Sequence, residues 1–179
     1  MQIFVSADMT EAGVVFVECS RSLTPAGRGI WRLKLPMEDG EVEKELVFKT
    51  DSAIPCVQAV DAGRAVCAIT DSALLVANKT SEGAWIAPRV YPMPQKLTCM
   101  DVHVSTAAPR KGKKAVVRSG HVVVGDKIGA LYILHDVVLK PQETPSSMKL
   151  HWHRSAVSAV KWALDGESQK LTRMLSTER

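Results

Sequence analysis

The stretch VVRSGHVVVGDKIGALYIL, residues 116–134, decides how this chain is expected to fold. It holds two largely apolar runs, at 116–125 and 130–134, on either side of a short polar turn. Such a pattern is typical of two strands joined by a hairpin. Asp126 and Gly129 suit the tight turn, because a glycine adopts a positive φ without steric cost.

The same pattern continues along the rest of the chain. Apolar runs of about four to eight residues alternate with turn residues, and no segment sustains a long helical period. The expected strands are 13–18, 29–35, 46–49, 54–60, 65–70, 73–77, 85–91, 97–103, 116–125, 130–134 and 156–162. The C-terminal stretch 167–179 fits either a short helix or a strand. The predicted fold class is therefore all-β.

A repeat organises these strands. IPCVQAV at 54–60 recurs 43 positions later as LTCMDVH at 97–103, and a similar strand follows at 157–162. The last interval contains two polar stretches that look inserted, 105–114 and 140–147. A spacing of about 40–45 residues with four strands per unit is typical of β-propeller blades.

Two partial WD-repeat patterns lie in register with this repeat. In the first, a turn precedes a strand in which Leu134 stands where a WD repeat has Trp. In the second, a histidine precedes an inner strand and an Asp-Gly turn follows it. The residues expected at structural WD-repeat positions are Asp126, Gly129, His153, Trp162, Asp165 and Gly166. The sequence thus predicts a WD40-type β-propeller.

The predicted propeller is incomplete. Seven blades need about 300 residues, and this chain supplies roughly three and a half to four. The approximate blades are 1–50, 51–92, 93–153 and a partial one at 154–179. Open sheet edges would remain. We therefore expect the segment not to be a stable autonomous domain, but to be completed by further sequence or by partner proteins.

Composition excludes several classes of protein. With 46% hydrophobic and 23% charged residues, the chain is too apolar for intrinsic disorder. Its four cysteines form no CxxC pair and are too sparse for a disulfide-rich secreted scaffold, which favours cytosol or nucleus. We expect no signal peptide and no membrane span. The net charge of +4 permits an acidic partner such as RNA.

No catalytic constellation is recognisable, so we expect no enzyme activity, cofactor, metal or small-molecule substrate. His151 and His153 would face one side of a strand, but further metal ligands are missing. We interpret one of them as part of a hydrogen-bond network, with Trp152 packed nearby. Asp101 and His103 suggest an acid–base pair without a nucleophile. We expect the cysteines to be buried and inert.

A basic stretch is the best functional candidate. Its residues are Arg110, Lys111, Lys113 and Lys114, with Arg118 shortly after. Cations this dense cannot lie in a core without partners, so they would project from a loop. They form either a solvated loop or a contact with RNA phosphates or an acidic protein surface, which would be salt-dependent and unspecific for sequence. The acidic stretch 38–45 is expected as a solvated hairpin loop, or else as a docking surface for a basic partner.

Several stretches together resemble one family of WD-repeat proteins. They are VFVECS (15–20), LKLP (33–36), EVEKELVF (41–48), KLTCMDVH (96–103), 125–134 and KLHWHRSAVSAVKWALDG (149–166). The family is that of the small-subunit processome subunit called U3 small nucleolar RNA-associated protein seventeen, Net1-associated nuclear protein or, in animals, WD repeat-containing protein seventy-five. The similarity covers roughly 13–166 and corresponds to an internal part of the first of the family's two propellers. The tail 169–179 departs from the family pattern.

The resemblance implies a non-catalytic scaffold of the small-subunit processome, the 90S pre-ribosome, in the nucleolus of the nucleus. The implied partners are other processome subunits, especially WD-repeat proteins of the same early-binding subcomplex, together with the 5′ external transcribed spacer of pre-rRNA and the U3 snoRNP. The implied roles are small-subunit rRNA maturation and RNA polymerase I transcription. The alternative is a generic WD40 protein–protein interaction module outside ribosome biogenesis.

Overall fold

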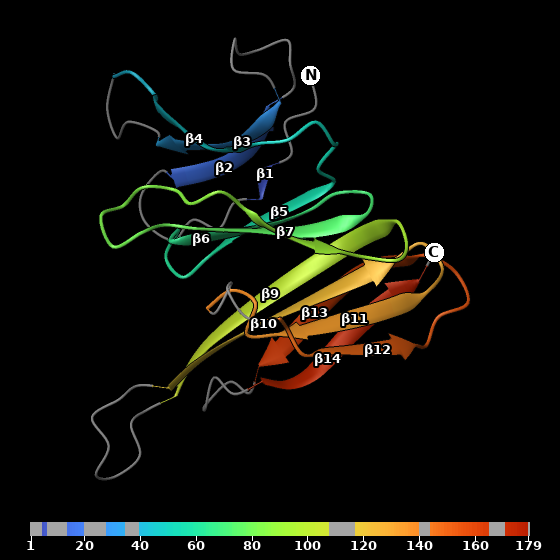
Figure 1. Ribbon diagram of the computed structural model, residues 1–179. Helices are drawn as coiled ribbons and strands as arrows, with labels where there is room; N and C mark the ends of the chain where they lie inside the picture. Colours follow the sequence, from blue (N-terminus) through green and yellow to red (C-terminus); the bar gives the residue numbers. More distant parts are fainter. Residues whose placement is uncertain are drawn as a thin grey trace, which may run out of the picture. The chain divides into compact units, whose positions relative to one another are not determined.

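Every regular element in the described part of the chain is a β-strand (Figure 1), which confirms the all-β prediction. The computed structural model describes residues 5–6, 14–19, 28–34, 40–107, 117–139, 144–164 and 171–178. The chain divides into two compact units, Met1–Lys96 and Leu97–Arg179. All strand pairs within both units are antiparallel.

The first unit contains two four-stranded sheets whose strand order follows the sequence. One sheet consists of β1 (Val5–Ser6), β2 (Val14–Cys19), β3 (Gly29–Lys34) and β4 (Glu43–Lys49). The other consists of β5 (Cys56–Val60), β6 (Ala65–Ile69), β7 (Ala73–Asn78) and β8 (Arg89–Pro92). Each sheet is therefore a meander in which every strand pairs with the next one along the chain.

The second unit contains a third four-stranded meander and a two-stranded sheet. The meander consists of β9 (Leu97–Ala107), β10 (Val117–Asp126), β11 (Ala130–His135) and β12 (Ser147–His151). The smaller sheet pairs β13 (Val157–Leu164) with β14 (Leu171–Glu178). Residues 171–178 of the C-terminal stretch that fitted helix or strand thus form a strand, because their backbone pairs with β13.

Some element boundaries differ from those expected. The acidic stretch was predicted as a loop through Glu45, but β4 already begins at Glu43. The cause is cross-strand charge pairing. Lys34 Nζ lies 3.2 Å from a Glu43 carboxylate oxygen, and Arg32 Nη1 lies 3.3 Å from Glu45 Oε2. Opposite charges facing each other on neighbouring strands favour the pairing, so this part of the acidic stretch joins the sheet.

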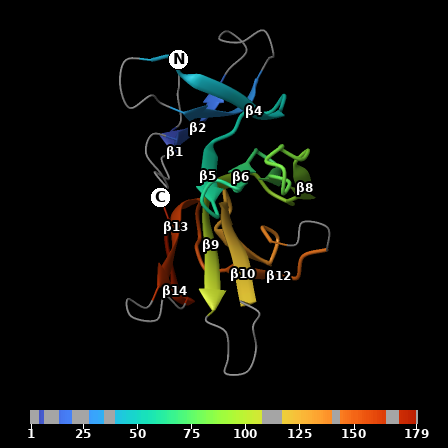
Figure 2. The ribbon, with the colours of Figure 1, turned by 90° about the vertical axis from the view of Figure 1, so that its left-hand side faces the viewer.

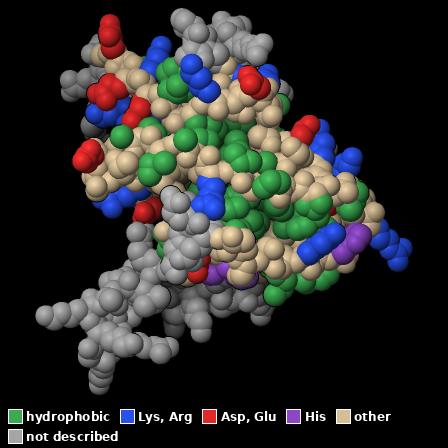
Figure 3. All heavy atoms as spheres, viewed as in Figure 1, with side chains coloured by type: hydrophobic (Ala, Val, Ile, Leu, Met, Phe, Trp, Pro, Cys, Tyr) green, Lys and Arg blue, Asp and Glu red, His purple; other side chains and the backbone are tan. Residues whose placement is uncertain are grey.

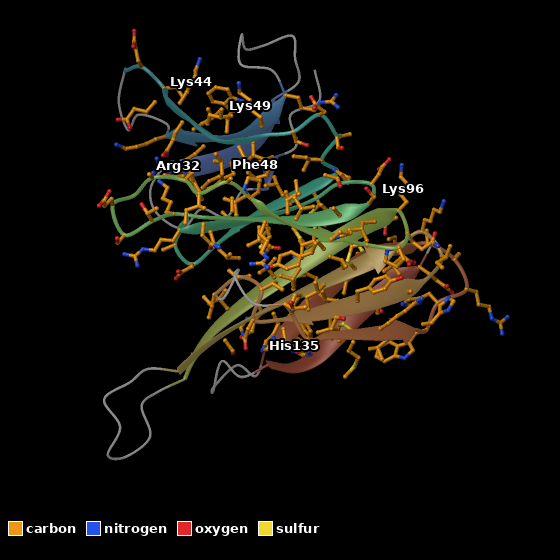
Figure 4. The ribbon with its side chains drawn as sticks, viewed as in Figure 1. Arg32, Lys44, Phe48, Lys49, Lys96 and His135 are labelled. Atoms are coloured by element: carbon orange, nitrogen blue, oxygen red, sulfur yellow. The ribbon has the colours of Figure 1, made fainter. Side chains whose placement is uncertain are left out.

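Apolar side chains from both sheets form one core in the first unit. Phe16, Ile30 and Phe48 from the first sheet pack with Val57 and Leu75 from the second. Figure 4 shows Phe48 pointing from β4 toward the second sheet. Burial of such side chains contributes about 1.5–3 kcal/mol each and is the main reason that the two sheets associate.

A polar contact also joins the two sheets of the first unit. Lys79, directly after β7, places its Nζ 3.3 Å from Glu45 Oε2 and 4.8 Å from the centre of the Trp85 ring. The Trp85 ring in turn meets Phe16 edge-on, with centroids 6.1 Å apart. The ammonium group is thus held between a carboxylate and an aromatic face.

The core of the second unit lies between the meander and β13. Val123 and Leu131 from the meander pack against Val157 and Val160 of β13, and Figure 2 shows β13 beside β9. Gly125 permits this close packing. A Cβ atom there would lie 2.7 Å from Val157 Cβ, a distance that real Cβ atoms do not show.

Candidate functional site

The side chains of the predicted RNA-contact residues all lie outside the described part of the structure. Arg110, Lys111, Lys113 and Lys114 lie outside the described residues, between β9 and β10 in the sequence. Arg118 lies on β10, with its backbone opposite Thr106, and its side chain is likewise not described. Whether these cations form a solvated loop or a contact surface stays a prediction.

The β10–β11 turn is organised by the buried carboxylate of Asp126. Its Oδ1 accepts hydrogen bonds from the backbone N–H groups of Ile128, at 2.9 Å, and Ala130, at 2.8 Å. Its Oδ2 accepts one from the Tyr132 hydroxyl at 3.2 Å. Burial, followed by the nearby Asp126 charge, raises the pKa of Tyr132. A fully buried carboxylate is tolerated here because three donors satisfy it.

Gly129 connects this turn to the segment between β12 and β13. Its φ is +93°, a conformation that favours glycine. The Gly129 carbonyl accepts a hydrogen bond from the His153 N–H at 3.3 Å. A Cβ on Gly129 would collide with the backbone of His153 and lie 2.9 Å from the Ser155 carbonyl oxygen. The segment after β12 therefore lies directly on the turn.

His153 and Glu178 secure the same segment to the end of β14. His153 Nε2 lies 2.7 Å from the Ser176 hydroxyl, and His153 Nδ1 lies 3.8 Å from Glu178 Oε2. Glu178 Oε2 accepts hydrogen bonds from the N–H groups of Arg154, at 2.8 Å, and Ser155, at 3.3 Å. These backbone donors lower the pKa of Glu178. The histidine thus serves a structural network.

The remaining residues expected at WD-repeat positions are Trp162, Asp165 and Gly166. Trp162 lies on β13 and packs against the core of the second unit. Its indole nitrogen is buried and has no hydrogen-bond partner among the described residues. Asp165 and Gly166 lie outside the described residues.

Asp101 and His103 do not have the geometry of a reacting pair. The Asp101 carboxylate is bound by β13, since Oδ1 lies 3.0 Å from Lys161 Nζ and Oδ2 accepts the Trp162 N–H at 2.8 Å. Burial lowers the pKa of His103, and the charge of Asp101 opposes this effect. Asp101 therefore joins two sheets, and the interpretation of both residues as structural agrees with these contacts.

A row of three histidines crosses the meander, which the sequence analysis missed. His121 on β10 stands opposite both His103 on β9 and His135 on β11. The Nδ1 atoms of His121 and His135 lie 3.1 Å apart, so one ring donates and the other accepts, and the ring planes are nearly perpendicular. Burial, and then the neighbouring His135, lower the pKa of His121. Only the strand register, not sequence spacing, brings these residues together.

The described residues contain no group of three His, Cys, Asp or Glu side chains placed to hold a metal ion. His151 and His153, considered as a metal pair, have separate partners. His151 Nε2 lies 3.0 Å from the Ile128 carbonyl oxygen, and His153 contacts Ser176. Trp152 was expected to pack nearby, but 62% of its surface is exposed. His151, the last residue of β12, and His153 anchor the chain on either side of Trp152, which leaves much of the indole in contact with solvent.

Among the described residues, Cys56, Cys67 and Cys99 form no disulfide bond. Burial raises the pKa of Cys67 to about 12 and also raises the pKa of Cys99. Both effects disfavour the reactive thiolate. Cys67 is buried as predicted, whereas Cys56 and Cys99 are only half-buried.

No family model matches the chain, and no curated protein shows significant sequence similarity to it. The described residues include no helix that is long enough and apolar enough to span a lipid bilayer.

Proposed function

We propose that this chain is part of a WD40-type β-propeller that acts as a non-catalytic binding scaffold. One observation carries this proposal. Three consecutive sheets each consist of four antiparallel strands in sequence order, and a two-stranded antiparallel sheet follows them. Radially repeated four-stranded sheets are the architecture of propellers. Such proteins bind partners through loops and strand edges.

The arrangement around the β10–β11 turn supports the assignment. Asp126 caps the turn, Gly129 provides the positive φ, and the segment that enters the next sheet lies on the turn through His153. In this proposal the contact ties the blade formed by β9–β12 to the sheet that follows it. Asp126 and His153 would thus have structural roles and no catalytic ones.

The resemblance in sequence supports a particular assembly. We infer that the scaffold belongs to the nucleolar small-subunit processome, within the subcomplex that engages the 5′ external transcribed spacer of pre-rRNA. Its partners would be WD-repeat subunits of the same subcomplex, with the U3 snoRNP nearby. Its roles would be small-subunit rRNA maturation and RNA polymerase I transcription. The basic residues Arg110–Lys114 and Arg118 would contact RNA phosphates there.

The test is affinity purification of the tagged endogenous protein, followed by mass spectrometry and RNA sequencing. Recovery of U3 small nucleolar RNA, 5′ spacer RNA and processome subunits is the expected result. Charge reversal at Lys111, Lys113 and Lys114 should then reduce the yield of RNA more than that of protein partners. Recovery of a different assembly without these RNAs would overturn the processome assignment and favour a generic WD40 interaction module.

A further inference from the structure

We propose that a corner of the second unit binds single-stranded RNA by stacking bases on Trp152 between flanking cations. The surface, here named the Trp152 corner, consists of Lys127, Ile128, Lys149, His151, Trp152 and Arg154. It combines the β10–β11 turn with the end of β12 and the segment that follows. None of its residues belongs to the basic stretch 110–118.

An exposed tryptophan is the centre of this surface. The chain has four tryptophans, and Trp31, Trp85 and Trp162 are all at least half-buried. Trp152 instead exposes 62% of its surface, and neighbouring Ile128 exposes 38%. An indole face open to water is an apolar platform on which any base can stack, and such stacking is largely independent of sequence.

The charged side chains of the Trp152 corner are all cationic. Residues 127–135 and 144–164 contain no Asp or Glu. Lys127, Lys149 and Arg154 are all exposed. In Figure 3 blue and purple side chains gather at the right-hand edge, where the start of β11 and the end of β12 lie in Figure 1. This combination of cations and aromatic surface suits a polyanion that also carries flat rings.

Two described carboxylates lie beside these residues, Asp126 next to Lys127 in sequence and Glu178 in contact with the backbone of Arg154. Asp126 is fully buried and bonded to its own turn. The carboxylate of Glu178 accepts two backbone N–H groups, from Arg154 and Ser155. Glu178 keeps its negative charge and offsets part of the cationic charge at Arg154. The exposed cations Lys127 and Lys149 supply the rest of the attraction for a phosphate.

The corner is held in place before any ligand binds. His151 is anchored through its ring to the Ile128 carbonyl at 3.0 Å, and the backbone N–H of His153 bonds to Gly129 at 3.3 Å. Trp152 stands between these two anchors. A side chain presented from a segment ordered in this way loses less conformational entropy on binding.

An acidic peptide is the competing ligand, but it would use only the cations. A single-stranded nucleic acid uses the cations and the indole together, so the observations favour it. The choice of RNA over DNA rests on the proposed function, since the stacking chemistry is common to both. The experiment therefore includes both nucleic acids and an acidic peptide.

The test is fluorescence anisotropy of the full chain with a labelled oligouridylate dodecamer. Trp152→Ala should weaken binding about tenfold, while Trp152→Phe should retain most of the affinity because a ring remains. Arg154→Glu should weaken binding and flatten the salt dependence by about 0.7 in log–log slope for each lost phosphate contact. Leu175→Ala, at another exposed apolar residue, and Lys44→Glu, at an exposed cation of β4, are the matched controls and should bind as the unaltered chain does.

Three results would overturn the proposal. They are absence of binding by the unaltered chain, undiminished binding by Trp152→Ala, and competition by polyglutamate as strong as that by unlabelled RNA. Equal affinity for oligodeoxythymidylate would support the Trp152 corner as a site for single-stranded nucleic acid but would overturn its preference for RNA. The processome assignment fails by a different measurement, the RNA content of the affinity purification. Either proposal can therefore fail without the other.

Discussion

The carboxylate of Asp101 on β9 accepts a hydrogen bond from the backbone N–H of Trp162 on β13, with an Oδ2–N distance of 2.8 Å. Its other oxygen lies 3.0 Å from Lys161 Nζ. The side chain of Asp101 is only 8% exposed, whereas that of Lys161 is 70% exposed. The hydrogen bond from the Trp162 N–H to Asp101 is thus shielded from solvent, whereas the ion pair with Lys161 is largely solvated. This hydrogen bond joins the meander of the second unit to the two-stranded sheet.

Replacing Asp101 should therefore loosen β13 from the meander. Asp101→Ala leaves the Trp162 N–H without its acceptor, which we expect to cost about 1–3 kcal/mol in the free energy of unfolding. Urea denaturation measures this loss. Lys161→Met is the matched control and should cost less than about 1 kcal/mol, because its ammonium is largely solvated. Equal losses for the two variants would contradict this ranking.

Gly129→Ala should destabilise the second unit more than an ordinary glycine substitution does. The variant must both strain a φ of +93° and displace the backbone of His153. Gly83→Ala is a close control, because Gly83 has a φ of +89° but no neighbouring atom within 4 Å of an added Cβ. We expect about 1 kcal/mol from the strain alone at Gly83. Thermal unfolding of Gly129→Ala should show a clearly larger loss of stability. Equal decreases in melting temperature for Gly129→Ala and Gly83→Ala would refute the role of the close contact.

The histidine row should make folding stability fall in acid. Burial holds the pKa of His121 and of His103 below the unfolded value, which is about 6.5. The unfolded chain therefore binds more protons than the folded one as the pH falls below about 6.5. The free energy of unfolding should therefore have its full value above that pH. It should decrease progressively as the pH falls toward the lower pKa values of the folded state.

Denaturation midpoints between pH 7.5 and pH 5 would measure this dependence. His121→Phe removes one of the two groups with a lowered pKa, so its stability should depend less steeply on pH than that of the unaltered chain. Met148→Ala, on the exposed strand of the same sheet, carries no titratable group and should keep the original slope. A slope unchanged by His121→Phe would show that other groups govern the acid response.

Cys67 should resist alkylation in the folded chain. With a pKa of about 12, only about one thiol in ten thousand is ionised at pH 8. Iodoacetamide labelling followed by peptide mass spectrometry should show Cys67 reacting only in denaturant. The half-buried Cys56 provides an internal comparison and should react earlier. Rapid native labelling of Cys67 would mean that β6 opens easily.

Local features were predictable from the residues alone. Alternating short apolar runs predicted the strands, and most of the expected ranges overlap those observed. The turn at Asp126 and Gly129 was recognisable because its chemistry lies within five consecutive residues. The missed strand β12 is instead short and largely exposed, so it lacks the apolar pattern on which such predictions depend. The strand at Glu43–Lys49 began earlier than expected because partners on β3 compensate its charges.

The amino-acid sequence by itself therefore determined an all-β chain of successive hairpins, since hydrophobic alternation and turn residues act over a few positions. Only the tertiary structure decided which distant side chains meet. Asp101 and Trp162 are 61 positions apart, and the row of His103, His121 and His135 exists only through strand register. The exposure of Trp152 was decided in the same way, by anchors on either side of it. Register and sheet packing depend on the summed burial of whole strands, which no local pattern contains.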